Sequence, residues 1–417
     1  MPVQNRKKAL LFLFFTLLID IIGLGIIIPV TPKLVMALTH QPISEASTWS
    51  GWLLFVYAGM QFLCAPIAGA LSDRFGRRPV LLLSLLAFGL DSLLTGFAPK
   101  ISWLFIGRAL AGSFGAAYAP ASAYIADVSP PEERAQNFGF LGAAFGLGFI
   151  IGPVLGGLLG QYGPRVPFFA AAGLAFANAT YGYFVLPESL PLDRRRPFSW
   201  RRANTLGSLV QLAQKPMLLS LGIIAFLHQL AHQVLPCTWS FFGMARFGWT
   251  EREVGYSLGA IGLSIALVQG GLMRRVIPKL GPARSASVGL VFAIIAYTGY
   301  AFADSERMVY VFMLPMALGG LVGPSIQGWM SSRTEANAQG ELQGALSSLS
   351  GLTAILGPPL MTQLFGRFNA ADAPVHFPGA AFAAASILEL FALFGLLHLL
   401  LRPGSAQGAA PVTTIAQ

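Results

Sequence analysis

Charge is scarce in this sequence of 417 residues: Asp, Glu, Lys and Arg together make up 11%, whereas 55% of the residues are hydrophobic. A soluble domain carries about 25% charged residues, so the composition excludes an ordinary soluble fold. Cysteine is also scarce, and Cys64 and Cys237 both fall inside apolar runs, which argues against a disulfide framework. What the chain has instead is long apolar runs, and these predict a protein that crosses the membrane many times.

The apolar runs predict an all-α membrane protein with twelve transmembrane helices. A helix needs about 20 apolar residues to cross the hydrocarbon core, and each run is close to that length. The predicted spans are 9–30, 49–70, 79–98, 101–126, 136–160, 166–186, 216–243, 254–273, 283–303, 308–330, 341–364 and 378–401.

The basic residues indicate how the chain is oriented. The net charge is +10, but Lys and Arg form short clusters between the apolar runs and no continuous basic face, which argues against nucleic acid as a partner. Nineteen of them fall in segments predicted to be internal and seven in segments predicted to be external. This asymmetry predicts that both termini lie in the cytoplasm. The charged start resembles a signal peptide, but Asp20 interrupts the run that follows, so we predict a retained first span.

The two halves of the chain resemble each other. Gly76 lies 205 residues before Gly281, and Gly152-Pro153 lies 205 residues before Gly357-Pro358. Gln136 and Gly139 match Glu341 and Gly344 at the same offset. The offset predicts parallel six-helix repeats, an arrangement known from one large class of transporters. We therefore predict an N-terminal half over 1–186, a cytoplasmic linker over 187–215, a C-terminal half over 216–401 and a cytoplasmic tail over 402–417.

The turn between the second and third spans reads GALSDRFGRRPV over residues 69–80 and carries four charges in twelve residues. Its arginines are explained by topology alone. Asp73 is not, because acids contribute little to orientation. An acid at a helix end can bind backbone amides or a basic neighbour, so we expect Asp73 to form a conformational latch.

This turn resembles the signature loop of the major facilitator superfamily, in the form found in the tetracycline-exporter branch of drug–proton antiporters. The resemblance covers nearly the whole chain. It extends to LLIDIIGLGIIIPVTP at 17–32, to residues 106–160, to RFGWTEREVGYSLGAIGL at 246–263 and to GELQGALSSLSGLTAILGP at 340–358.

The resemblance implies a transporter of two helical lobes that opens alternately to the two sides of the membrane. In that family the loop acid pairs with charges at neighbouring helix ends and braces the outward-facing state. The latch expected from the resemblance comprises Gly69, Asp73, Arg74, Gly76, Arg77, Arg78, Asp127 and Arg134. The family's antiporter motif corresponds to Gly146, Gly148, Gly152, Pro153, Gly156 and Gly157, whose small residues allow close helix packing; a role in gating and ordinary packing both remain open.

Four charged residues lie inside predicted spans: Asp20, Asp91, Arg108 and Glu389. A charge at mid-span costs at least about 2.5–3.5 kcal/mol, so each requires a partner or a function. We predict that Asp20 couples transport to protons, with Arg108 as its electrostatic partner and Asp91 as an accessory acid; a static ion pair is the alternative. Glu389 has no counterpart in the family pattern and is expected at a contact between spans.

Polar residues in the second and seventh spans are the predicted lining of a substrate cavity: Gln61, Gln229 and Gln233. Gln229 and Gln233 are four residues apart, which places them on one helix face, although hydrogen bonding between helices is the alternative. His228 and His232 have the same spacing. No acid or thiol near them in sequence completes a metal site, so we predict no metal and hydrogen-bonded or packed histidines, with a proton role left open.

Two positions depart from the tetracycline-exporter pattern: Ala293 stands where the branch usually has an acid, and Ile265 where it often has a histidine. The expected function is therefore export of amphipathic drugs, with tetracyclines as candidates, by a proton-coupled antiporter. It would need no cofactor, act as a monomer in the bilayer of a bacterial inner membrane, and use the proton gradient. A proton- or metabolite-coupled uptake carrier is the alternative. An enzyme is disfavoured because the aqueous segments contain no nucleophile–base pair, metal motif or nucleotide-binding loop.

Overall fold

The structure, a computed structural model, describes residues 3–115, 118–130, 133–196, 212, 214–335 and 338–401. These residues form helices joined by short turns, and the described part of the chain contains no strand. The first half comprises α1 (Val3–Ile27), η1 (Ile28–Val30), α2 (Thr31–Thr39), α3 (Ile43–Phe75), α4 (Arg77–Phe97), α5 (Ile101–Phe114), α6 (Tyr118–Val128), α7 (Arg134–Gly160), α8 (Val166–Val185) and the short turn η2 (Leu192–Arg194).

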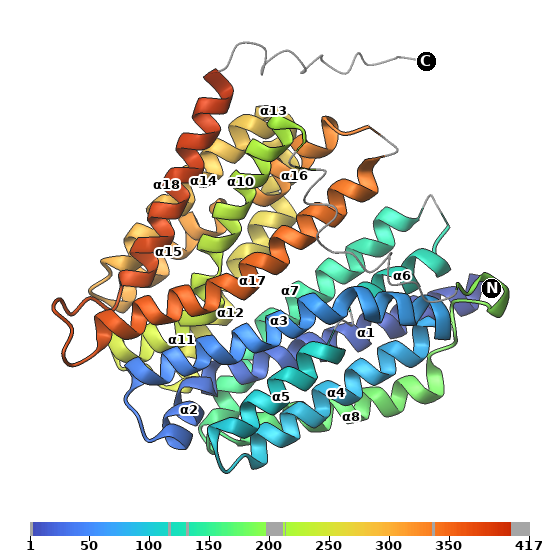
Figure 1. The fold of residues 1–417 in the computed structure, drawn as a ribbon, viewed down its shortest axis with the longest axis horizontal. Helices are drawn as coiled ribbons and strands as arrows, with labels where there is room; N and C mark the ends of the chain where they lie inside the picture. The colour runs from blue at the N-terminus through green and yellow to red at the C-terminus, as the bar shows by residue number, and fades with distance from the viewer. Residues whose placement is uncertain are drawn as a thin grey trace.

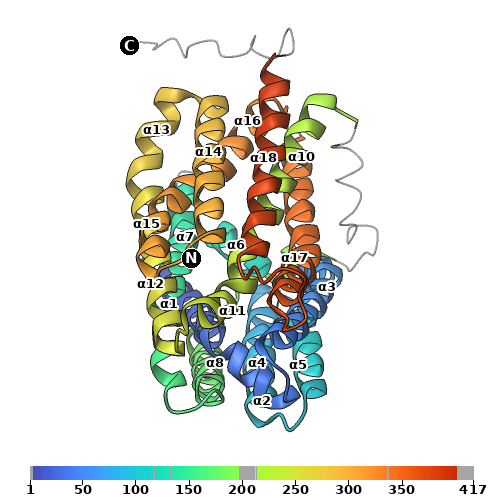
Figure 2. The ribbon, with the colours of Figure 1, turned by 90° about the vertical axis from the view of Figure 1, so that its left-hand side faces the viewer.

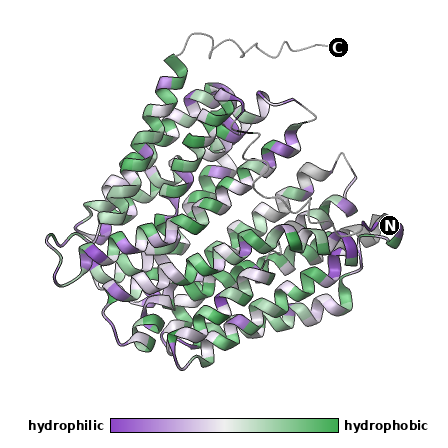
Figure 3. Cartoon of the chain, viewed as in Figure 1, coloured by the Kyte–Doolittle hydropathy of each residue, from purple (hydrophilic) through white to green (hydrophobic). Residues whose placement is uncertain are grey.

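The second half comprises α10 (Pro216–His232), α11 (Val234–Phe247), α12 (Glu251–Leu267), η4 (Val268–Leu272), α13 (Met273–Leu280), α14 (Pro282–Ala301), α15 (Glu306–Gly319), α16 (Val322–Ser332), α17 (Gln339–Asn369) and α18 (Ala380–Leu401). Helices occupy all twelve of the ranges predicted from the sequence. Nine helical segments of the described chain are long and apolar enough to cross a membrane by themselves. Figure 3 shows the hydrophobic residues running along the helices of both halves. The protein is therefore a multi-pass membrane protein.

Several spans are built from two consecutive helices, and the breaks repeat along the chain. η1 begins at Ile28 and the α10–α11 junction lies at Gln233, 205 residues later. Gly115 ends α5 and Gly320 ends α15, again 205 residues apart. Glycine and proline at such points free backbone groups inside the membrane, which is tolerated where neighbouring helices or a cavity satisfy them. The breaks thus follow the same offset as the sequence repeat.

The helices are arranged in two bundles, one formed by α1–α8 and the other by α10–α18 (Figure 1). The bundles meet at the end that carries α2 and α11 and diverge toward the end that carries the N-terminus and α13. α3 lies beside α17 at the junction in both views (Figures 1 and 2), and α7 packs against α12. These two helix pairs form most of the contact between the halves.

The buried hydrophobic residues explain why the halves meet at one end only. The largest core cluster joins both halves and includes Val35, Phe168, Trp239 and Phe365. Two smaller clusters lie apart from each other at the opposite end, one around Leu13 and Tyr124 of the first half and one within the second half. The topology predicted from the sequence assigns the joined end to the outside and the divided end to the cytoplasm, and with that topology this conformation would be inward-facing.

Candidate functional site

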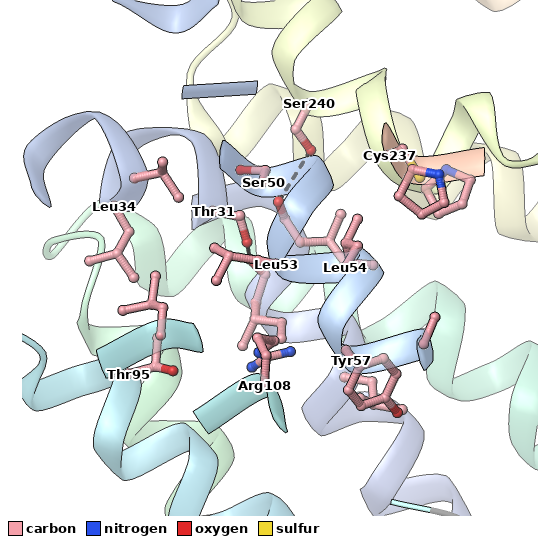
Figure 4. A pocket seen from close by; sticks show the side chains of 18 of the residues that line it. Thr31, Leu34, Ser50, Leu53, Leu54, Tyr57, Thr95, Arg108, Cys237 and Ser240 are labelled. Atoms are coloured by element: carbon pink, nitrogen blue, oxygen red, sulfur yellow. Dashed lines mark hydrogen bonds between the residues drawn. The ribbon is translucent and has the colours of Figure 1, made fainter. Parts of the chain in front are cut away.

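A cavity of about 310 Å³ lies between the two halves. Helices α1, α2, α3, α4, α5 and α8 line it from the first half, and α11 and α17 line it from the second. Most lining side chains are apolar, such as Leu24, Leu53 and Phe241. A few polar groups converge on it, among them Tyr57 and Arg108 (Figure 4). A mostly apolar cavity of this size with a few oriented polar groups is typical of a small-molecule site.

Arg108 is the one basic side chain that the described residues contribute to the lining of this cavity, and it pairs with Asp91. Asp91 lies on α4 and is fully buried, whereas the Arg108 side chain is 12% exposed. The guanidinium also lies over the Tyr57 ring at 6.0 Å from its centroid. Gly107 makes the pair possible, because a Cβ there would collide with the Asp91 carboxylate. The pair therefore places a desolvated positive charge at the cavity wall, with its countercharge behind it.

The pairing corrects one expectation from the sequence: the partner of Arg108 is Asp91, not Asp20. Asp20 is half-buried on α1, and the described residues place no basic side chain within ion-pair distance of it. Tyr57 lies under the Arg108 guanidinium and accepts a hydrogen bond from Gln61, and sequence reasoning did not identify it. Its signal in the sequence was its position one helical turn before Gln61.

The predicted cavity glutamines separate into two places. Gln61 and Gln233 line the central cavity. Gln61 donates to the Tyr57 hydroxyl and to the Gly115 carbonyl, both at 3.4 Å. Gln229 does not line it; it lies in a second cavity within the C-terminal half. The two amides therefore line different cavities, with Gln233 at the junction of α10 and α11.

The small residues of the antiporter motif bring α7 against two different helices. A Cβ at Gly148 or Gly152 would meet Ile21 or Gly25 of α1 within 2.8 Å, and one at Gly156 would meet the Ile26 carbonyl. A Cβ at Gly157 would lie 2.5 Å from the Glu251 carbonyl oxygen and 3.1 Å from the Gly255 Cα of the other half. Pro153 packs next to Gly25, and its carbonyl faces Gly255. Gly146 has open space around it.

The turn between α3 and α4 contains the predicted latch acid. Asp73 accepts a hydrogen bond from Arg77 Nη1 at 2.5 Å, and Arg77 Nε reaches Asp127 Oδ2 at 3.2 Å. Gly76 joins the two helices with φ +110°, a conformation that disfavours any other residue. Arg77 thus connects the two acids and ties together α3, α4 and α6 within the first half.

Glu188 completes this network and was missed from the sequence. It accepts the backbone N–H groups of Arg77 at 2.8 Å and Arg78 at 3.3 Å, at the first turn of α4, and that of Leu190 at 3.0 Å. A carboxylate at a helix N-terminus satisfies orphan donors and complements the helix dipole. The Arg195 guanidinium lies 3.9 Å from it, and Arg196 N–H donates to the Asp73 carbonyl at 3.1 Å. The start of the linker therefore binds the latch turn.

The other predicted latch residues differ in their surroundings. Arg78 donates to the Tyr183 carbonyl and stacks on the Tyr183 ring at 5.3 Å. Arg74 lies over Phe75 and is exposed. Gly69 has open space beside it on α3. The side chain of Arg134 lies outside the described residues.

The end of the interface that is predicted to be external is closed by polar contacts as well as by glycine packing. Lys33 of α2 pairs with the buried Glu251 of α12, Nζ to Oε2, at 2.7 Å. Ser240 donates to the Ile28 carbonyl at 3.2 Å (Figure 4), and Ser47 donates to the Thr362 carbonyl at the same distance. All three contacts join the first half to the second, so they must break when this end opens.

Glu389 lies at a contact between spans, as predicted. Its carboxylate is fully buried on α18 and binds His228 of α10. The expectation of a hydrogen-bonded histidine is therefore confirmed for His228.

Comparisons with known proteins agree with this geometry. The family model described as the Major Facilitator Superfamily matches residues 13–358. The chain is 38% identical over 362 residues to the tetracycline resistance protein, class C, of Escherichia coli, covering 87% of this chain and 91% of that one. It is 29% identical to multidrug resistance protein 2 of Bacillus subtilis, covering 90% and 92%. Among solved structures, the human organic anion transporter MFSD10 matches with a TM-score of 0.69 at 24% identity, covering 95% of this chain and all of that one; this likeness concerns the fold alone.

Proposed function

The chain belongs to the major facilitator superfamily, and from this we propose that it exports amphipathic drugs from the cytoplasm in exchange for protons. The protein is a transporter and not an enzyme. Its similarity to tetracycline resistance and multidrug resistance proteins over most of both chains makes tetracyclines the first cargo to test. The observation that carries the proposal is the cavity between the halves, which is apolar apart from a few converging polar groups.

The charge arrangement in that cavity supports a cargo that carries its own charge. Arg108 presents a guanidinium to the cavity while Asp91 balances it from behind. A planar guanidinium binds carboxylate or enolate oxygens through parallel hydrogen bonds, which a lysine cannot reproduce. An amphipathic molecule with an acidic edge and an apolar body therefore fits the lining.

Proton coupling in the first half is proposed for Asp20, with the Asp91–Arg108 pair as a second element. Asp20 is half-buried on α1 and lacks a basic partner among the described residues. An unpaired carboxylate in the membrane is suited to bind and release a proton between conformations. No cofactor is required, because one proton moving through 100 mV supplies about 2.3 kcal/mol.

The cellular setting follows from the relatives and the topology. We place the protein in a bacterial inner membrane with both termini in the cytoplasm and propose that it acts as a monomer. The inward-facing conformation then opens the cavity to the compartment from which drug is collected.

The function is tested by a drug-susceptibility panel in a pump-deficient bacterium that expresses the chain, followed by transport in everted membrane vesicles. We expect resistance to at least one amphipathic drug and drug accumulation in vesicles when a pH gradient is imposed. An absence of resistance together with substrate-driven uptake into cells would establish the uptake carrier instead.

The coupling residues are tested in the same vesicles. Asp20→Asn is expected to abolish drug accumulation driven by a pH gradient. The equilibrium exchange of labelled for unlabelled drug should remain unchanged. Arg108→Ala should reduce both, because it removes the cavity charge, and Arg108→Lys should restore transport only in part. Concentrative transport by Asp20→Asn would remove Asp20 from this role and favour Asp91.

A further inference from the structure

His228 and Glu389 form a buried pair of titratable groups inside the C-terminal half. His228 Nδ1 lies 2.8 Å from one Glu389 carboxylate oxygen and 3.2 Å from the other. The Glu389 side chain is 0% exposed and that of His228 is 11% exposed. The pair joins α10 to α18, which pack side by side. It lies in the other half of the molecule from Asp20, Asp91 and Arg108 and takes no part in their network.

Cavities adjoin the pair from two directions. His228 lines a cavity of about 330 Å³ between α10, α16 and α17, together with the polar side chains of Gln229, Gln327 and Gln343. It also lines a small cavity of about 40 Å³ that includes His232, Gln269 and Tyr297. Glu389 lines neither, so His228 separates the carboxylate from both spaces. A proton from cavity water can therefore reach Glu389 through the imidazole.

Few other titratable groups face the pair. The His232 ring lies 6.4 Å from the His228 ring on the same helix. Tyr297 of α14 lines the small cavity together with both histidines. The amides and hydroxyls of the two linings come from α10, η4, α14, α16 and α17, and the described parts of α12, α15, α16 and α17 contribute no charged side chain to either lining. Among the described residues, no other charged side chain in these two cavities can therefore balance a charge on the pair.

We propose that His228 and Glu389 form a second proton-carrying site, which serves the C-terminal half of this exporter. With one shared proton the pair is net neutral, either as imidazolium and carboxylate or as imidazole and carboxylic acid. Release of that proton from His228 to the cavity leaves one negative charge buried, which is costly without a partner. The proton therefore leaves only when the cavity is hydrated, as at the open cytoplasmic end, and is regained from the other side after the conformational change.

The position of the pair supports this assignment. Ala293 and Ile265, the two positions where the chain departs from the exporter pattern, line the same small cavity as His228. The His228 imidazole of α10 thus places an ionisable group at this cavity, with its carboxylate partner on α18 behind it.

The inference rests on the proposed function, and its main test uses the same vesicles. Glu389→Gln keeps the shape and a hydrogen bond to His228 but removes the titratable group. We expect drug accumulation driven by a pH gradient to fall at least 10-fold, and a 10-fold change corresponds to about 1.4 kcal/mol. The exchange of labelled for unlabelled drug should stay within about 2-fold of wild type. Glu389→Asp, which can still carry a proton, should recover part of the accumulation.

Ser386→Ala is the matched control. Ser386 lies one turn before Glu389 on α18 and hydrogen-bonds Thr298 of α14, oxygen to oxygen, at 2.8 Å, so its removal breaks a contact between helices without removing a titratable group. It should leave both measurements unchanged. Equal loss of accumulation and exchange in Glu389→Gln, together with lowered thermal stability, would show a structural pair and overturn the proposal.

A measurement without cargo separates this inference from the proposed function. Infrared difference spectra of the purified protein, taken across a pH jump, should contain a carboxyl band of Glu389, either the loss of a carboxylic acid or a shift of a carboxylate as His228 loses its proton. This band should be lost in Glu389→Gln and kept in Ser386→Ala. Spectra of Glu389→Gln identical to those of wild type would show that the Glu389 carboxyl takes no part in proton release, whatever the drug panel shows. A wild-type protein that transports no drug but loses this band in Glu389→Gln would refute only the export function.

Discussion

The two ends of α7 have the same kind of sequence and opposite surroundings. Near its external end, a side chain at Gly152 or Gly157 would collide with the backbone of α1 or α12. Near its other end, the described residues place nothing within 4 Å of a Cβ at Gly139, Gly142 or Gly146. Gly139, Gly142, Gly146, Ile150 and Gly157 follow helical spacing along one stripe.

The same contrast appears on α12. Gly255, Gly259 and Gly262 contact α7, whereas Gly270 and Gly271 have open space in the π-helical turn η4. Open space beside a stripe of small residues has a physical explanation if a second helix occupies it in another state. We infer that the cytoplasmic glycines of α7 and α12 approach each other when the external end opens, as expected for rigid-body rocking of two repeats. Glycines at both ends then serve one helix pair in two conformations.

The largest expected effect comes from filling the packed end. In Gly157→Leu the new side chain would meet the Glu251 carbonyl and Gly255, so the external end cannot close as it does in this conformation. We expect transport to be abolished and the free energy of unfolding to fall by about 1–3 kcal/mol. Vesicle transport and thermal unfolding of the purified protein measure the two effects. Gly173→Leu on α8, where a Cβ meets nothing within 4 Å, should behave as wild type. Normal transport by Gly157→Leu would refute the close approach.

Filling the open end should separate transport from stability. Gly142→Leu finds free space in this conformation, so the thermal unfolding midpoint should not fall. The leucine occupies the space that the cytoplasmic ends need in order to close, and we expect drug transport to fall at least 10-fold while drug binding from the cytoplasmic side is kept. Full transport would contradict the inferred approach of α7 and α12.

The latch turn is the charged part of the cytoplasmic end. Asp73→Asn removes the ion pair with Arg77, which is partly exposed, so the loss of stability should not exceed about 1 kcal/mol. Transport should nevertheless be strongly reduced at near-normal membrane expression, because the acid is expected to stabilise the closed cytoplasmic end. Transport at the wild-type level by Asp73→Asn would show that Asp73 is an ordinary surface charge with no role in transport.

Glu188→Gln tests the part of the latch that comes from the linker. The carboxylate accepts two N–H groups at the start of α4, so its neutralisation should cost about 0.3–1 kcal/mol of stability and reduce transport less than Asp73→Asn. Thermal unfolding at low and high salt measures the electrostatic contribution of Glu188 to stability, and this contribution should be smaller at high salt. Insensitivity to salt would argue against the helix-dipole explanation.

The smallest effect is expected at the external ion pair. Glu251→Gln leaves the half-exposed Lys33 free to be solvated, so it should weaken closure of the external end by less than about 1 kcal/mol and change drug efflux less than 5-fold. Lys33→Ala leaves the buried Glu251 carboxylate without its countercharge and should have the larger effect of the two. An opposite order would show that the carboxylate has a role other than pairing.

Much of the fold follows from the sequence because the membrane imposes simple rules. Spans such as α4 and α18 are visible as apolar runs, and the 205-residue offset places the helix breaks as well as the motifs. Asp73 stands out because topology does not explain an acid there. Glu188 does not stand out, because an acid directly after a span is common and the N–H groups of α4 that it binds lie more than a hundred residues away.

What the sequence by itself determined is therefore the number and order of the apolar runs, the duplicated halves, and which few residues carry charge inside them. The tertiary structure decided how those charges pair: Arg108 with Asp91 and not Asp20, and Glu389 with His228 across 161 residues. It also placed Gln229 and Gln233 in different cavities. Helical periodicity specifies which face a residue occupies, but the partner on that face depends on the packing of distant helices, which no local pattern encodes.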